Sequence, residues 1–121
     1  VMAAGRYDFT IEQGSDLNLD ISYKDSNGTL LQLGSGYEAA MSIKETVDSA
    51  AIVALTSNAN GGITLSNNAP NISIYINFAT TANFDFTEAF YDLELTNTTL
   101  TPNTKSRLIE GRVELSREIT T

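Results

Sequence analysis

The chain contains no cysteine, no histidine and no tryptophan. Without cysteine it can form neither a disulfide nor a thiolate nucleophile, so its folding must depend on packing rather than on cross-links. Without histidine it lacks the base of a Ser-His-Asp triad and the commonest metal ligand. The remaining chemistry is that of carboxylates, hydroxyls, Lys and Arg, and we expect a protein that is not an enzyme and binds no cofactor.

Positive charge is also scarce, because seven Lys and Arg stand against fifteen Asp and Glu and give a net charge of -8. No basic cluster interleaves with aromatic residues, so nucleic acid is not an expected partner. No apolar run reaches the roughly 20 residues that a membrane-spanning helix needs, and the first residues lack the pattern of a secretory signal. We therefore expect neither a membrane partner nor secretion.

What the chain does contain is typical of one folded domain. It has 121 residues, of which 41% are hydrophobic and 18% are charged. Such a composition can offset the conformational entropy that folding removes, unlike that of a disordered tail. We expect a single domain over residues 1–121, with residues 1–5 as a flexible N-terminal segment.

Apolar residues recur at every second position over much of the chain, which is the period of a strand with one buried face. An Asn-Gly pair at residues 27–28 predicts a hairpin that closes on a short strand at 29–33. Gly111 is the place where the last strand is expected to bend. The other predicted strands cover residues 7–11, 17–23, 37–44, 62–65, 72–78, 89–96 and 106–118.

Three segments have weaker patterns. Residues 45–51 have weak helical character, and residues 52–55 fit either a strand or the end of a helical turn. Residues 80–84 fit one helical turn that crosses between two sheets. Seven or eight short strands with turns about every ten residues are typical of an antiparallel sandwich or a barrel. We therefore expect an all-β fold with at most one helical turn.

Carboxylates offer two candidate cation sites. Residues 25–28 open like a calcium loop, but Gly36 stands where the loop needs a bidentate Glu, so a turn is the better interpretation. Asp8, Glu12 and Asp16 could gather at one end of a sandwich and bind a cation. Solvated surface carboxylates are the simpler explanation, and we expect no metal site.

A long stretch of the chain, residues 49–84, contains no Asp, Glu, Lys or Arg. Its polar side chains can hydrogen-bond across a contact without the cost of desolvating an ion, as at the centre of an assembly interface. An equally good explanation is a pair of buried strands joined by polar turns. On the interface hypothesis, the candidate contact residues are Asn58, Asn60, Asn67, Asn68 and Asn71.

Aromatic residues offer a further possibility. Tyr37, Tyr75 and Tyr91 could form a platform for a sugar ring. All three lie in alternating apolar segments, which makes core or half-buried packing the better interpretation. A glycan therefore remains the less favoured ligand.

Six short segments, in order along the chain, carry a resemblance to a known family. They are FTIEQGSD at residues 9–16, DSNG at 25–28, GYEAAMSIK at 36–44, GI at 62–63, YDLEL at 91–95 and RLIEGRV at 107–113. In this pattern the chain resembles the small β-sandwich virion proteins of tailed bacteriophages, including immunoglobulin-like domains of baseplate and tail-adaptor proteins. The resemblance implies an immunoglobulin-like antiparallel sandwich in which YDLEL pairs with the strand that holds RLIEGRV.

The resemblance also implies a function. We expect a structural protein of the virion tail, neck or baseplate, made in the host cytoplasm and assembled with other virion proteins and with copies of itself. The alternatives are a carbohydrate-binding or adhesin module and a capsid decoration protein. A hydrolase would need two carboxylates about 5 to 10 Å apart across a cleft.

Overall fold

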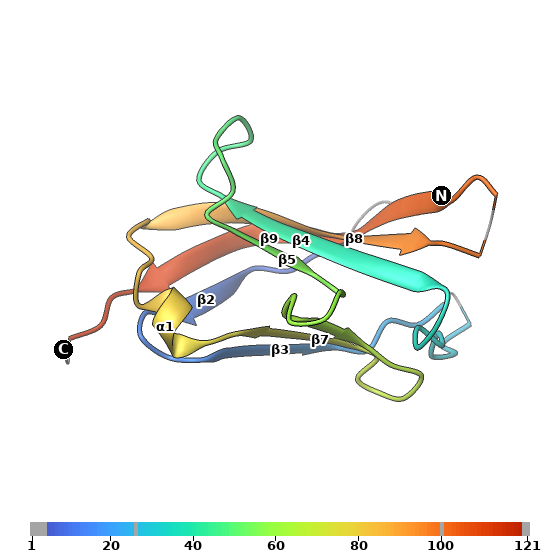
Figure 1. Ribbon diagram of the computed structural model, residues 1–121. Helices are drawn as coiled ribbons and strands as arrows, with labels where there is room; N and C mark the ends of the chain where they lie inside the picture. The colour runs from blue at the N-terminus through green and yellow to red at the C-terminus, as the bar shows by residue number, and fades with distance from the viewer. Residues whose placement is uncertain (1–4, 26, 100, 120–121) are drawn as a thin grey trace.

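The computed structural model describes residues 5–25, 27–99 and 101–119 and arranges them in two β-sheets with one short helix (Figure 1). Sheet A has the strand order β1-β9-β8-β4-β5, with β2 also paired to β9, and sheet B has the order β3-β7-β6. The strands of sheet A are β1 (Gly5–Arg6), β2 (Phe9–Glu12), β4 (Tyr37–Lys44), β5 (Val53–Thr56), β8 (Glu88–Asn97) and β9 (Thr104–Ser116). Those of sheet B are β3 (Leu17–Ile21), β6 (Ile63–Leu65) and β7 (Ile72–Ile76).

The predicted all-β class is confirmed, and most predicted strands are present. Residues 52–55, left open between strand and helix, contribute to β5. The pairings are antiparallel except at β1 and β2, which both run parallel to β9. Gly5, which we expected in a flexible segment, pairs with Ile109 in β1, whereas residues 1–4 lie outside the described part of the chain.

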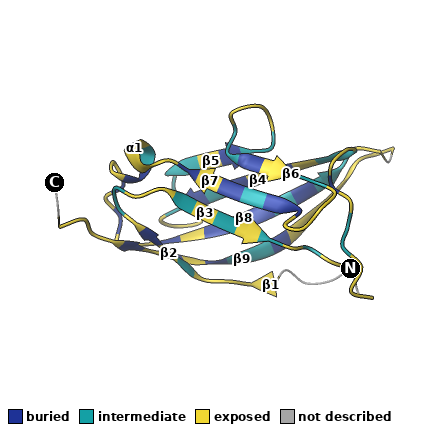
Figure 2. Cartoon of the chain, turned by 90° about the horizontal axis from the view of Figure 1, so that it is seen from below, coloured by how far each residue is buried: buried dark blue, intermediate teal, exposed yellow. Residues whose placement is uncertain are grey.

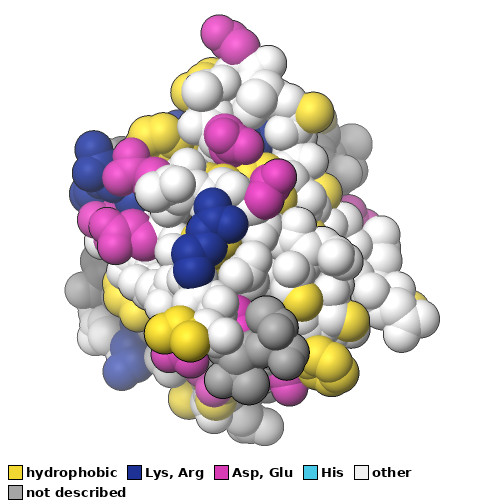
Figure 3. Space-filling model, turned by 90° about the vertical axis from the view of Figure 1, so that its left-hand side faces the viewer, with side chains coloured by type: hydrophobic (Ala, Val, Ile, Leu, Met, Phe, Trp, Pro, Cys, Tyr) yellow, Lys and Arg dark blue, Asp and Glu magenta, His cyan; other side chains and the backbone are white. Residues whose placement is uncertain are grey.

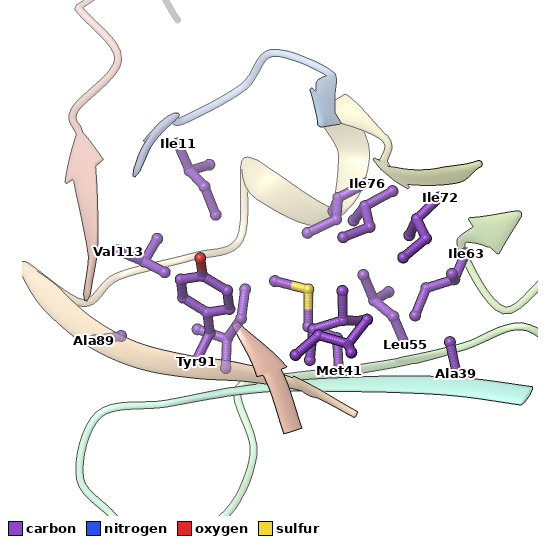
Figure 4. Packing of buried hydrophobic residues seen from close by; sticks show 14 of the residues in the cluster. Ile11, Ala39, Met41, Leu55, Ile63, Ile72, Ile76, Ala89, Tyr91 and Val113 are labelled. Atoms are coloured by element: carbon purple, nitrogen blue, oxygen red, sulfur yellow. The ribbon is translucent and has the colours of Figure 1, made fainter. Parts of the chain in front are cut away.

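The core lies between the two sheets, as the burial pattern in Figure 2 shows. Met41 of sheet A points toward Ile76 of sheet B, and the ring of Tyr91 points toward Ile11 (Figure 4). Each fully buried aliphatic side chain contributes roughly 1.5–3 kcal/mol relative to exposure. With no disulfide to help, this layer holds the sheets together.

The hairpin predicted after residue 24 closes, but its second strand is shorter than predicted. The turn forms, because the Asp25 carboxylate accepts from the backbone N–H groups of Asn27 (2.9 Å) and Thr29 (3.0 Å). An antiparallel bridge joins Lys24 to Leu30, and the N–H of Leu31 donates to the carbonyl of Tyr23 (3.2 Å). Leu33 leaves this pairing, since its N–H donates to the carbonyl of Ser66 (3.2 Å).

The weak helical pattern of residues 45–51 also gives no helix. The backbone N–H of Thr46 donates to the hydroxyl of Ser49 (3.0 Å), and Ser49 in turn donates to the carbonyl of Thr46. Such local side-chain bonds compete with helical hydrogen bonds and favour a turn. The segment is the loop that projects between β4 and β5 at the top of Figure 1.

The helical turn predicted at residues 80–84 begins two residues earlier, as α1 (Phe78–Thr81). Asn77 caps it, because its side chain accepts from the N–H of Thr80 at 2.9 Å. Phe78 therefore leaves the strand in which we expected it to pack, and it is 60% exposed. The helix leads from β7 of sheet B to β8 of sheet A, as predicted.

The edge of sheet A is held by a junction at Tyr7 and Asp8, between β1 and β2. Tyr7 donates its N–H to the carbonyl of Glu110 (3.0 Å) and accepts from the hydroxyl of Tyr91. The Asp8 carboxylate accepts from the N–H of Arg112 at 2.8 Å. Gly111 lies opposite this junction and leaves room for the carbonyl of Tyr7.

The regular pairing of β9 is interrupted before Gly111, the residue at which we expected a bend. The ladder between β8 and β9 changes register between Leu93 and Glu94, which pair with Ile109 and Arg107. Leu108 is therefore the extra residue of a bulge. Because Gly111 has no side chain, the carbonyl of Tyr7 and the carboxylate of Asp8 can lie close to it.

We expect Gly111→Ala to destabilise the protein by about 1–3 kcal/mol, because the new methyl group collides with Tyr7 and Asp8. Urea unfolding measures this free energy. Gly5→Ala is the matched control, since its methyl group meets only ordinary contacts at 3.6 and 3.7 Å. Equal stabilities of the two variants would contradict the steric role of Gly111.

A second expectation concerns Tyr91, whose pKa is raised by burial and, to a lesser degree, by the negative charge of Asp8. The neutral phenol is thus favoured in the folded state, and its contribution to stability is lost as the pH rises above about 10. Below that pH, Tyr91→Phe should cost about 1 kcal/mol through the lost hydrogen bond to Tyr7. In urea titrations the advantage of the wild type over Tyr91→Phe should shrink as the pH is raised from 9 to 11. An advantage that is constant with pH would show this assignment to be wrong.

Candidate functional site

The segment without charged residues forms one side of the sandwich. It contains β5, which is the outer strand of sheet A, and β6, which is the outer strand of sheet B. The turn at residues 57–62 joins them, and the N–H of Thr56 donates to the carbonyl of Gly61 at 2.9 Å. A parallel bridge between Thr56 and Gly62 keeps the two edges close. We call β5, β6 and the turns at residues 57–62 and 66–71 the β5/β6 side.

The opposite side of the sandwich, at β2 and β3, is acidic. Glu12 lies on β2, Asp20 on β3, and Asp16 just before β3. A comparable division is seen in Figure 3, where charged side chains gather on one flank of the molecule and uncharged ones predominate on the other. The net charge of -8 is therefore unevenly distributed over the surface.

A groove of about 450 Å³ runs along the β5/β6 side. Residues 57–65 form much of its wall, so two of the candidate contact residues, Asn58 and Asn60, lie in it, and both are exposed. Tyr37 and Tyr75 line it as well. The groove offers amides, hydroxyls and aromatic rings, and its lining contains no ionised group.

Two further candidates lie in the neighbouring turn. Asn67 is exposed, and its side-chain carbonyl accepts from the N–H of Gly34, a residue of the groove wall, at 2.8 Å. Asn68 is exposed too, and its backbone N–H donates to the hydroxyl of Ser66 at 2.9 Å. The structure thus places Asn67 beside the groove and Asn68 in the turn beyond it.

The prediction that the fifth candidate, Asn71, is a contact residue is wrong. Its side chain is completely buried, so it cannot contact a partner. Its carbonyl accepts from the N–H of Tyr23 (2.7 Å), and its amide donates to the carbonyls of Tyr23 and Leu31 (both 2.9 Å). These bonds fasten the segment between β3 and β4 to sheet B.

The sequence prediction did not assign Tyr75 to the surface. Tyr37 is half-buried and Tyr91 is buried, as expected, but Tyr75 is 45% exposed. It lies between Ile74 and Ile76, whose side chains face the core. Because side chains alternate along a strand, Tyr75 must face outward, and this signal was present in the sequence.

The three acidic residues considered as a cation site do not gather. The Asp8 carboxylate binds the N–H of Arg112, and that of Asp16 accepts from the N–H of Phe78 at 2.7 Å. Within residues 5–25, 27–99 and 101–119, no group of three or more potential ligands is placed to hold a metal ion.

A second hollow, of about 370 Å³, lies on the outer face of sheet A. The exposed side chains of Val47 and Phe90 line it together with charged residues. Arg107 lies 3.3 Å from both Asp92 and Glu110, so these two carboxylates are joined through a shared cation. This arrangement differs from the pair of free carboxylates that cleaves glycosides.

No protein-family model matches the chain, and no curated protein matches it in sequence. Over the described residues, no helix has the length and apolar character needed to cross a membrane.

We expect Asn71→Ala to lower the free energy of unfolding by about 2–4 kcal/mol, because it leaves the part-buried N–H of Tyr23 and C=O of Leu31 without partners. Thermal or urea unfolding measures the loss. The exposed Asn68→Ala serves as control and should change stability by less than about 0.5 kcal/mol. Similar losses for the two variants would refute the anchoring role of Asn71.

Proposed function

We propose that this chain is a non-enzymatic structural protein that assembles through protein–protein contacts, with the β5/β6 side as its contact surface. The observation that carries the proposal is that two outer strands, from different sheets, lie together and that neither they nor the turn between them contain a charged residue. Exposed strand edges are usually protected by charged residues or proline, because they can pair with other chains. Neither β5 nor β6 carries such protection.

The strand arrangement supports an immunoglobulin-like assignment of the sandwich. Immunoglobulin-like domains pack a sheet built around their last strands against a second sheet that contains their second strand. Here β9, β8 and β4 lie side by side in sheet A, and β3, β7 and β6 form sheet B. The first strands, β1 and β2, join the sheet of the last strand, β9.

A place in the virion of a tailed phage, in its tail, neck or baseplate, is supported by the positions of the resembling segments. Residues 13–16 follow β2, and residues 36–37 enter β4, after the chain has crossed from sheet B to sheet A. Residues 91–95 of β8 pair with β9, where Tyr91 lies opposite Gly111. The pairing of residues 91–95 with β9 is the one that the resemblance implies. The proposed partners are other virion proteins and further copies of the chain.

One observation favours a second function, carbohydrate binding. Tyr37 and Tyr75 line the groove together with Asn58 and Asn60, and aromatic rings with amides are the groups that recognise neutral sugars. Of the two residues, only Tyr75 is well exposed, and the pKa of its hydroxyl is raised by desolvation and by the nearby carboxylate of Asp16. The two tyrosines therefore do not form an uncharged aromatic platform. Protein assembly therefore has the stronger support.

The assembly proposal is tested by placing a charge on the β5/β6 side. The protein purified from its natural source should have a solution mass well above 13.1 kDa, alone or with co-purifying proteins. Thr64→Glu on β6 should weaken this association at least roughly tenfold, because an ion must then be desolvated at the contact. Sedimentation velocity and mass spectrometry give the readouts.

Thr10→Glu provides the matched control, since it adds the same charge on β2, at the opposite side. It should leave the association unchanged. A strict monomer that binds no protein from its own source, but binds a neutral oligosaccharide through Tyr75, would overturn the proposal in favour of the second function. Microscopy of the intact particle with a labelled chain tests the virion assignment separately.

A further inference from the structure

The hydrogen bonds of sheet B show which backbone groups of β6 face outward. Tyr75 donates its N–H to the carbonyl of Gly62 (2.8 Å), and Ser66 donates to the carbonyl of Asn71 (2.9 Å). In an antiparallel ladder, hydrogen-bonded pairs alternate with non-bonded pairs. Leu65 pairs with Ile72, between the bonded positions, so its N–H and C=O groups point away from β7.

The outward groups of Leu65 face the groove of the β5/β6 side, whose wall also includes Leu33, Gly34 and Tyr37. Leu65 itself lines the groove of the β5/β6 side. No turn, loop or side-chain hydrogen bond among the described residues takes up its N–H or its C=O group. Nearer the start of β6, the bridge between Thr56 and Gly62 closes the edge. Just beyond β6, the N–H of Leu33 donates to the carbonyl of Ser66 (3.2 Å). Between these two contacts, the N–H and C=O groups of Leu65 have no partner among the described residues.

We propose that a second copy of this chain pairs with this edge, with the two β6 strands antiparallel around a two-fold axis. The three-stranded sheets B of two copies then form one continuous sheet. The Leu65 residues of the two copies face each other and exchange two backbone hydrogen bonds, which is the closed, self-complementary contact that a two-fold axis requires. This inference rests on the proposed assembly function and names its partner and its geometry.

Electrostatics selects this edge for a contact between copies. Two chains that each carry a net charge of -8 repel one another, and contact through the acidic side would bring Asp16 and Asp20 of both copies together. By contrast, the described residues that line the groove at β6 include no Asp, Glu, Lys or Arg. A three-residue strand makes a small interface, so the dimer is weak when isolated and is reinforced where many copies are held together.

The test uses the full chain in two measurements. In the unmodified protein, hydrogen exchange at the Leu65 amide should slow at least roughly fivefold between dilute and millimolar samples, because the fraction of dimer rises. The exchange rates of exposed amides in β3 should not change. Leu65→Pro removes the outward N–H without removing a bond to β7, and proline is tolerated at such an edge position. It should raise the dissociation constant of the dimer at least roughly tenfold in sedimentation equilibrium.

Two controls isolate the backbone effect. Leu65→Ala keeps the N–H and should retain most of the association, and Asp20→Asn on β3 should retain all of it. Dimers that persist in Leu65→Pro but are lost in Thr64→Glu would overturn strand pairing and still support the β5/β6 side as the interface. A protein that stays monomeric at millimolar concentration would overturn this inference, whereas the assembly function would then require a different partner. Exchange at Leu65 that is slowed by a neutral oligosaccharide and not by concentration would overturn both.

Discussion

Packing between the two sheets is the constraint on which the rest of this structure depends. The chain has no disulfide, so the apolar layer formed by residues such as Met41, Ile74 and Leu93 must offset the entropy of ordering the strands. The packing of this layer also determines which side chains lie on the surface. Because side chains alternate along each strand, fixing Ile74 and Ile76 in the core fixes Tyr75 on the surface, beside the groove.

The same packing gives the surface its division into an acidic side and an uncharged side. The path of the chain brings β5 and β6, which belong to different sheets, to one side through a short turn. Buried Asn71 contributes from within, because it holds the segment that carries Leu31 and Leu33 against sheet B. Packing in the core thus positions the walls of the groove at β6, and the absence of charged residues from the local sequence makes its lining uncharged.

Much of the fold could be predicted from the sequence, and the reasons are local. Strands β7 and β8 were predicted because one face of each is buried and apolar residues alternate along them. The strand predicted at residues 29–33 is shortened because, beyond its bonds to Tyr23 and Asp25, its backbone also binds Ser66 and Asn71, which lie far away in the chain. Local patterns cannot show such long-range competition for backbone groups.

The candidate site was predictable to a smaller extent. The absence of charge marked the correct segment, but it could not show that two sheet edges meet there. Asn67, Asn68 and Asn71 are alike in residue type and lie in one turn, yet Asn71 is buried because it directly precedes β7. The junction at Tyr7 and Asp8 gave no signal at all, since it depends on a distant glycine, Gly111.

The parallel pairing of β2 with β9 has a mechanical consequence. Strand β2 runs in the same direction as β9, the last strand (Figure 1). A pull on the start of β2 and the end of β9 would therefore load the four paired positions between Phe9 and Ser116 in shear, all at once, rather than peel them apart one by one. Such a pairing resists stretching along the strands.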